Sequence, residues 1–182
     1  YMDSIFPGVD REISKQAKRS FERQGIKFRL GVRVEGAEAS GEGVVVAYQD
    51  GDTTECIEGN VALIAVGRRA HTDGLGLTHI GIEPDRRGRI DVDHRFGTSA
   101  PGVYAIGDVV PGPMLAHRAE EEGIAVAELL AGLAGAVNHD IIPSVIYTDP
   151  EIASVGKTEA QLQDEGVTYV VGKFPFAANG RR

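Results

Sequence analysis

Short apolar runs separated by glycine and proline predict an alternation of helices and strands. Over residues 11–24, Ile13, Ala17 and Phe21 recur every fourth position, which predicts a helix with one narrow packing face. Asp10 precedes this helix and is a favourable N-cap residue. The basic remainder of the helix is expected to face water.

Four segments further along the chain predict strands. Residues 26–30 form a short apolar run after the helix. Residues 44–48 and 53–57 flank an Asp-Gly-Asp turn, which predicts an antiparallel hairpin. Residues 61–66 are apolar without alternation, as expected for a strand that is buried on both faces of a sheet.

A turn, a strand, a break and a helix follow one another between residues 98 and 123. The apolar residues 103–106 predict a buried strand that stops at Gly107 and Asp108. A strand that ends in Gly-Asp presents a carboxylate at the carboxyl edge of a sheet, where open α/β sheets bind ligands. The start of the next helix offers unpaired N–H groups and a positive dipole end. Together these features indicate one half of a cofactor clamp.

The helix after the Pro-Gly-Pro loop is expected to run to residue 133, with three glutamates, residues 120–122, early in it. Small residues at helical spacing predict close packing against another element. They are Ala116, Ala119, Gly123 and Ala127.

The last part of the chain changes to an α+β pattern. Residues 145–147 and 152–155 predict two strands. Thr158 and Gln161 predict a capping box at the start of a helix, and residues 169–174 predict a further strand.

Composition narrows the possible partners and compartments. The 182 residues carry a net charge of −8, which disfavours sequence-independent binding to nucleic acid or to an anionic membrane. No apolar run approaches the roughly 20 residues that span a bilayer, and the first residues lack a signal-peptide pattern. We therefore expect the cytoplasm or an organelle matrix, such as the mitochondrial matrix.

Two kinds of site lack their residues in this sequence. The single cysteine, Cys56, excludes an internal disulphide and a cysteine-based metal cluster, and we expect it to be a structural small apolar residue of a strand and not a reactive thiol. The Gly41 to Gly43 stretch precedes a strand, whereas a dinucleotide fingerprint precedes a helix. We therefore assign no catalytic residue and no metal ligand.

Residues 98–123, above all the Tyr-Ala-Ile-Gly-Asp and Met-Leu-Ala-His stretches, resemble the second flavin-binding segment of the pyridine nucleotide-disulphide oxidoreductases. The Met-Leu-Ala-His-Arg-Ala-Glu-Glu-Glu-Gly run is most similar to the dihydrolipoamide dehydrogenase branch of that family. The resemblance extends from residues 6–10 to residues 174–176.

The resemblance implies an α/β fold that combines parts of two FAD/NAD(P)-binding Rossmann-like domains with the start of an α+β dimerisation domain. Residues 1–71 would be the C-terminal part of the NAD-binding domain. Residues 72–141 would be the C-terminal part of the FAD-binding domain, and residues 142–182 the beginning of the interface domain. The family's redox cysteines, its nucleotide fingerprints and its catalytic His-Glu pair would lie outside this chain.

The family's cofactor contacts carry over to six residues. Asp108 would accept a hydrogen bond from the ribityl chain of FAD, residues 114–117 would lie beside the pyrimidine end of the flavin, and Gly67 would touch the nicotinamide side of NAD. The implied cofactor-binding set is therefore Gly67, Asp108, Met114, Leu115, Ala116 and His117.

Each of these residues also has an ordinary interpretation. An aspartate after a strand is often a turn or cap residue, a helix after proline needs no ligand, and a glycine at a strand end simply allows a turn. His117 is given no catalytic role, because the family's base is a different histidine. Arg68 and Arg69 are most simply solvated loop residues.

The activity that the resemblance implies is oxidation of dihydrolipoamide, with electrons passing through FAD to NAD. The implied partners are a second copy in a homodimer, and the core and lipoyl domains of a 2-oxoacid dehydrogenase complex. Two alternatives remain open: another disulphide reductase of the same superfamily, or a non-catalytic remnant or assembly module. The isolated chain is expected to be colourless and inactive.

Overall fold

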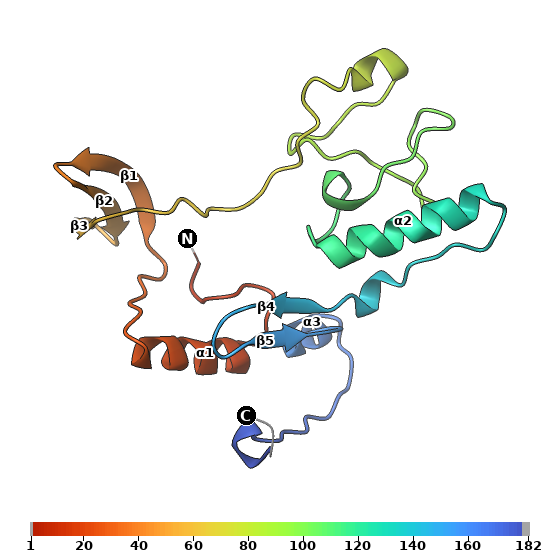
Figure 1. Ribbon diagram of the computed structural model, residues 1–182. Helices are drawn as coiled ribbons and strands as arrows, with labels where there is room; N and C mark the ends of the chain where they lie inside the picture. The colour runs from red at the N-terminus through yellow and green to blue at the C-terminus, as the bar shows by residue number, and fades with distance from the viewer. Residues whose placement is uncertain (1, 180–182) are drawn as a thin grey trace. The chain divides into compact units, whose positions relative to one another are not determined.

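The computed structural model describes residues 2–179, which form a mixed α/β structure (Figure 1). The chain divides into two compact units. One unit combines Tyr1–Asn60 with Val145–Arg182, and the other is Val61–Ser144. No helix in the described part of the chain is both long and apolar enough to cross a membrane.

The predicted first helix is confirmed as α1 (Arg11–Arg23), with Ala17 and Phe21 buried. Ile13 was expected on the same face but is 42% exposed. Asp10 occupies the N-cap position without capping α1, because its carboxylate accepts a hydrogen bond from the Glu159 backbone N–H at 2.8 Å. Asp10 thus accepts an N–H at the start of a helix, Glu159–Asp164, that lies near the other end of the sequence.

The predicted hairpin is confirmed and belongs to a three-stranded antiparallel sheet. Its strands are β1 (Arg33–Ser40), β2 (Gly43–Asp50) and β3 (Thr53–Gly59), in that order. The sequence did not predict β1, whose polar and small residues are exposed along its whole length. Residues 26–30 were expected to be a strand, but they are irregular.

The single cysteine of the chain lies in this sheet. Cys56 lies in β3 as predicted but is exposed, as is every residue of that strand. Tyr48 is the buried side chain of β2, and its hydroxyl donates a hydrogen bond to Glu55 on β3 at 2.5 Å. The sheet therefore buries an aromatic ring and leaves the thiol in solvent.

The C-terminal elements follow most of the sequence pattern. β4 (Ser144–Ile146) and β5 (Ile152–Ser154) pair as predicted, and α3 (Glu159–Asp164) begins with the predicted capping box. Phe21, Ala17 and Ile152 form the buried core here, which joins α1 to β5. Residues 169–174 were expected to be a strand but are irregular.

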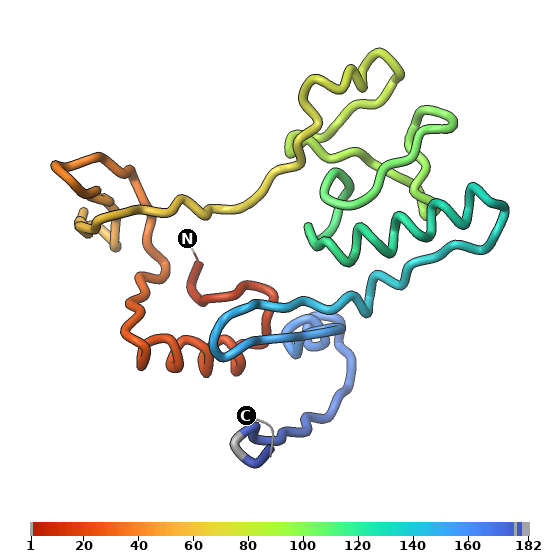
Figure 2. Tube along the Cα trace, in the orientation of Figure 1, coloured from red at the N-terminus to blue at the C-terminus, as the bar shows by residue number. Residues whose placement is uncertain are grey.

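The largest disagreement with the sequence pattern concerns residues 61–66. This segment is extended (Figure 2), yet it belongs to no strand, and Val61, Leu63, Ile64 and Val66 are 78–93% exposed. A strand forms only where another strand satisfies its backbone. Within residues 2–179 none pairs with this run, because the sheets contain only β1 to β5.

The core of the second unit is built largely from loops. Its buried residues are Ile82, Ile90, Ala100, Ala105 and Val110. Residues 103–106 were expected to be a strand but make only one bridge, between Gly97 and Tyr104. Short 3-10 turns, η1 (Leu77–Ile80) and η2 (Gly107–Val109), add to this core. Two further 3-10 turns are η3 (His139–Ile141) and η4 (Phe176–Ala178).

α2 (Ala116–Leu130) is the longest helix in residues 2–179 and ends three residues before the predicted boundary. Its small residues provide close packing as expected. A Cβ on Gly107 would lie 3.0 Å from the Ala119 Cβ, and one on Gly123 would lie 3.5 Å from Ile106 Cδ1. Residues 106 and 107 therefore lie directly on this face of α2.

Candidate functional site

Asp108 lies in η2, directly beside α2. Gly107 has a φ of +71°, in the left-handed region that favours glycine, and this turn separates Asp108 from the preceding segment. The Asp108 carboxylate is partly exposed, and its Oδ2 accepts a hydrogen bond from Arg68 Nη2 at 2.6 Å. The Arg68 side chain is 71% exposed, in line with the expected solvated loop arginine, and it is also paired with Asp108.

The predicted helix start lies next to this turn. Leu115 is the N-cap of α2 and is extended, with φ −127° and ψ 132°. The first N–H groups of a helix have no partner inside it, so those of Ala116 and His117 are available to a ligand. Met114 and Leu115 are half-buried, and Ala116 is exposed. An electron-rich ligand edge would be stabilised at this end of α2.

The His117 imidazole is already engaged. Its Nε2 lies 2.7 Å from the carbonyl oxygen of Pro143. Because a carbonyl only accepts hydrogen bonds, Nε2 must carry the proton in this contact. The His117 side chain thus links the start of α2 to Pro143, in the segment that follows the helix.

Gly67 stands at the end of the exposed apolar run. Its φ of +130° is unfavourable for residues with a side chain, and a Cβ there would meet no atom within 4 Å. The structure thus leaves open space around Gly67. A ligand could approach its backbone closely, but nothing in the described chain defines a surrounding pocket.

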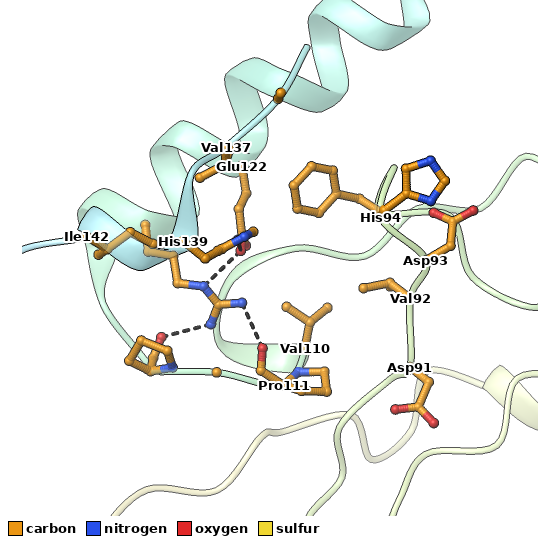
Figure 3. Close-up of a pocket in the computed structure, with 15 residues that line it drawn as sticks. Asp91, Val92, Asp93, His94, Val110, Pro111, Glu122, Val137, His139 and Ile142 are labelled. Carbon is orange, nitrogen blue, oxygen red and sulfur yellow. Dashed lines mark hydrogen bonds and ion pairs between the residues drawn. The ribbon is translucent and has the colours of Figure 1, made fainter. Parts of the chain in front are cut away.

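The sequence missed a buried cluster behind Asp108, which Figure 3 shows. Glu122 is completely buried and Arg118 is 4% exposed, although both are charged. Arg118 Nε lies 2.8 Å from Glu122 Oε1 in an ion pair, and His139 Nε2 lies 2.8 Å from the same oxygen. Glu122 Oε2 accepts the Gly107 N–H at 2.7 Å.

One signal in the sequence could have located this cluster. Arg118 and Glu122 are four residues apart, so they lie on the same face of a helix. That face is the small-residue face, because Glu122 follows Ala119 by three residues and adjoins Gly123. Charged residues next to a stripe of small residues predict a buried ion pair.

A groove of about 510 Å³ borders the cluster. Its lining comes from segments 91–96, 110–113 and 136–142, together with Arg118 and Glu122. In this lining Asp93 accepts backbone N–H bonds from Gly97 and Arg95, and these hold the pKa of its carboxyl below the usual range. Among residues 2–179, no group of three or more His, Cys, Asp or Glu side chains could hold a metal ion.

Comparison with known protein families decides the relationship. Residues 1–123, more than half of the chain, match the model of the pyridine nucleotide-disulphide oxidoreductases. The chain belongs to this family. Residues 142–182 match the dimerisation domain of the same pyridine nucleotide-disulphide oxidoreductases.

Individual members of the pyridine nucleotide-disulphide oxidoreductase family are similar along the whole chain. Mitochondrial dihydrolipoyl dehydrogenase of Pisum sativum is 52% identical over 183 residues, covering 100% of this chain and 36% of the relative. Leghemoglobin reductase of Glycine max is 51% identical, covering 100% of this chain and 35% of that protein. This chain thus spans about a third of the length of these relatives.

A solved structure supports the same fold. The Cu(II) complex of RclA, an HOCl-induced flavoprotein disulfide reductase from Escherichia coli, has a TM-score of 0.86 and 27% sequence identity. The match covers 99% of this chain and 40% of that chain. The mixed α/β arrangement is therefore that of part of a flavoprotein disulfide reductase.

Proposed function

We propose that this chain is part of a flavin- and NAD-dependent dihydrolipoyl dehydrogenase, to which it contributes flavin contacts and the start of the subunit interface. One observation carries the proposal: the partly exposed Asp108 carboxylate lies in a turn packed against α2. The 52% identity to a plant dihydrolipoyl dehydrogenase favours this activity within the family.

The residues of this site fit FAD. The Asp108 carboxylate offers acceptor oxygens for a ribityl hydroxyl, and the hydrogen bond from Arg68 orients it. The backbone of Met114 to His117 would lie beside the electron-rich end of the flavin, where the α2 dipole stabilises negative charge. When bound, FAD supplies the electron-transfer chemistry itself. Gly67 would accommodate the nicotinamide side of NAD.

The same proposal extends to domains, partners and compartment. Residues 1–71 belong to the NAD-binding domain, residues 72–141 to the FAD-binding domain and residues 142–182 to the interface domain. The working form is a homodimer that engages the core and lipoyl domains of a 2-oxoacid dehydrogenase complex. The match to a dimerisation domain supports the homodimer. The mitochondrial names of the relatives support a mitochondrial matrix location, and the cytoplasm is the alternative.

The test uses the polypeptide encoded by the whole gene. It is expected to purify yellow and to reduce NAD with dihydrolipoamide, whereas its Asp108→Ala variant loses most of its flavin. Asp73→Asn, at an exposed aspartate of the same unit that does not line the groove, is the control and should retain flavin. A colourless wild-type protein, or full flavin occupancy in Asp108→Ala, would refute the proposal.

Two other functions are separated by the same preparation. Another disulphide reductase would bind flavin but reduce a different disulphide, and the likeness to RclA favours testing that class. A non-catalytic remnant or assembly module would bind no flavin at all. The purified 182-residue chain alone is expected to be colourless and inactive, since about two thirds of its relatives' length is missing from it.

A further inference from the structure

We infer that the buried Arg118–Glu122 ion pair is a positioning device that sets the distance between Asp108 and the start of α2. The inference rests on the proposed function, because it assigns this pair a role in holding the flavin-binding segment. Neither residue is expected to touch the cofactor. They are positioning residues that act through the backbone on either side of the site.

The segment between Gly107 and Met114 is held to α2 at both ends, and Glu122 holds the end at Gly107. Its Oε2 accepts the N–H of Gly107 at 2.7 Å, one residue before Asp108. Gly107 also lies against Ala119, which would be 3.0 Å from an added Cβ. The amide and the Cα of Gly107 are thus both fixed to α2, so the Asp108 side chain must start from a defined point.

Arg118 holds the other end of this segment, at residues 111–113. Its Nη1 donates to the carbonyl oxygen of Pro113 at 2.9 Å, and its Nη2 donates to that of Pro111 at 2.8 Å. Pro113 immediately precedes Met114, and Pro111 lies three residues before it. The guanidinium also fills the space beside Gly112, where an added Cβ would lie 2.4 Å from Nη1. Arg118 therefore fixes the loop that enters the proposed flavin-binding residues.

The ion pair joins these two ends. Arg118 and Glu122 are 4% and 0% exposed, and their contact distance is 2.8 Å. Figure 3 shows Glu122 and His139 together on one side of the guanidinium and Pro111 on the other. His139 adds a hydrogen bond to Glu122 Oε1 at 2.8 Å, which ties η3 to the same carboxylate.

Stability alone does not explain why a pair of charges is kept here. Replacing a buried ion pair by apolar residues of similar volume is often neutral or stabilising. Such residues could not bond the Gly107 amide or the two proline carbonyls. Only the charged pair has the hydrogen-bonding groups that hold both ends at once, and this separates positioning from packing.

The experiment uses the whole-gene polypeptide and three variants: Glu122→Gln, the double variant Arg118→Met/Glu122→Leu, and the control Glu121→Gln at the exposed neighbouring position. Three quantities are measured on each: the FAD dissociation constant, the thermal midpoint, and amide hydrogen exchange of residues 107–113. Glu122→Gln should speed exchange at the Gly107 amide by about tenfold, as expected when a charged carboxylate acceptor is replaced by the weaker, neutral amide oxygen. It should weaken FAD binding by about tenfold as well.

The double variant gives the decisive result. It should keep a thermal midpoint close to that of wild type, yet show the same fast exchange and weak FAD binding as Glu122→Gln. Recovery of FAD affinity together with the midpoint would overturn the inference, because the pair would then be a packing element. Unchanged exchange at Gly107 in Glu122→Gln would overturn it too.

The same measurements distinguish failure of the proposed function from failure of this inference. If wild-type protein binds no FAD, the flavin assignment is refuted, while exchange at residues 107–113 still decides whether the pair holds both ends. Glu121→Gln should match wild type in all three quantities, so a change there would attribute the effects to helix charge and overturn the inference.

Discussion

Residues 61–66 and the segment from Gly107 to Glu122 reverse the usual relation between hydropathy and burial. The first is an apolar run that lies exposed, with Val66 93% accessible. The second contains two charged side chains that are almost completely buried. Both segments belong to the same unit, so the difference arises from their local partners.

The local partners that decide burial in these two segments are groups that pair with charges or form hydrogen bonds. Glu122 and Arg118 are buried with their opposite charges paired, and the Gly107 amide and two proline carbonyls bond their other polar atoms. Arg118 Nε lies 2.8 Å from Glu122 Oε1 but makes no hydrogen bond of good geometry. The apolar run has no neighbouring strand among the described residues to pair with its backbone. Burial here therefore follows from whether the polar atoms of a segment are satisfied, and hydropathy alone does not decide it.

The largest expected effect is on the buried pair. Arg118→Ala leaves the Glu122 carboxylate buried without its main partner and should lower the free energy of unfolding by about 3–5 kcal/mol. Urea denaturation measures this change. Arg68→Ala removes the arginine of an exposed pair and should cost at most about 1 kcal/mol. Equal losses in the two variants would contradict the contrast drawn above.

The next effect concerns the turn that Glu122 holds. Gly107→Ala forces a residue with a side chain into the left-handed region against Ala119 and should destabilise the chain by about 1–3 kcal/mol. Gly102→Ala is the matched control, since Gly102 has a φ of +78° but no atom near its Cβ position. Gly107→Ala should be the more destabilising of the two, and calorimetric midpoints would reveal any exception.

The exposed run should respond very differently to substitution. Leu63→Lys should change the free energy of unfolding by less than about 0.5 kcal/mol, because the side chain is already 88% exposed. It should reduce aggregation of the isolated chain, since an exposed apolar extended segment favours association. Light scattering measures this, with Leu133→Lys as a charge-matched control outside the run. Marked destabilisation by Leu63→Lys would show that the run is packed.

The smallest effect is expected at an exposed carboxylate. The Arg89 guanidinium and two backbone N–H groups lower the pKa of Asp85 to about 2. A lowered pKa means that the stabilisation is complete above the ordinary aspartate pKa and is lost as the pH falls through about 2. An NMR titration should place the carboxyl transition there and move the Arg87 and Arg89 amides with it. A midpoint near 4 would contradict this.

The sequence predicted elements whose signals are local. The Thr158–Gln161 capping box, the hairpin turn at residues 50–52 and helix α1, whose apolar residues recur every fourth position, each depend on neighbours in sequence. Those three elements are confirmed. The strand expected at residues 61–66 was wrong, because a strand depends on partners that the pattern of one segment does not contain.

The site was predictable to a similar extent. The adjacency of Asp108 to the start of α2 follows from a Gly turn and a proline loop, both visible in sequence. The Arg68 contact joins residues 40 positions apart, and the His139 contact joins residues 17 apart. Such contacts depend on the path of the chain, so the sequence suggested neither of them.

The core shared by Phe21 and Ile152 has a consequence for the order of events during synthesis. The segment Val61–Ser144 is continuous in sequence, whereas α1 must wait for β5 and α3 before its apolar face is covered. At about 5–20 residues per second, the early helix stays uncovered for several seconds. During that interval, chaperones have their best opportunity to bind the nascent chain.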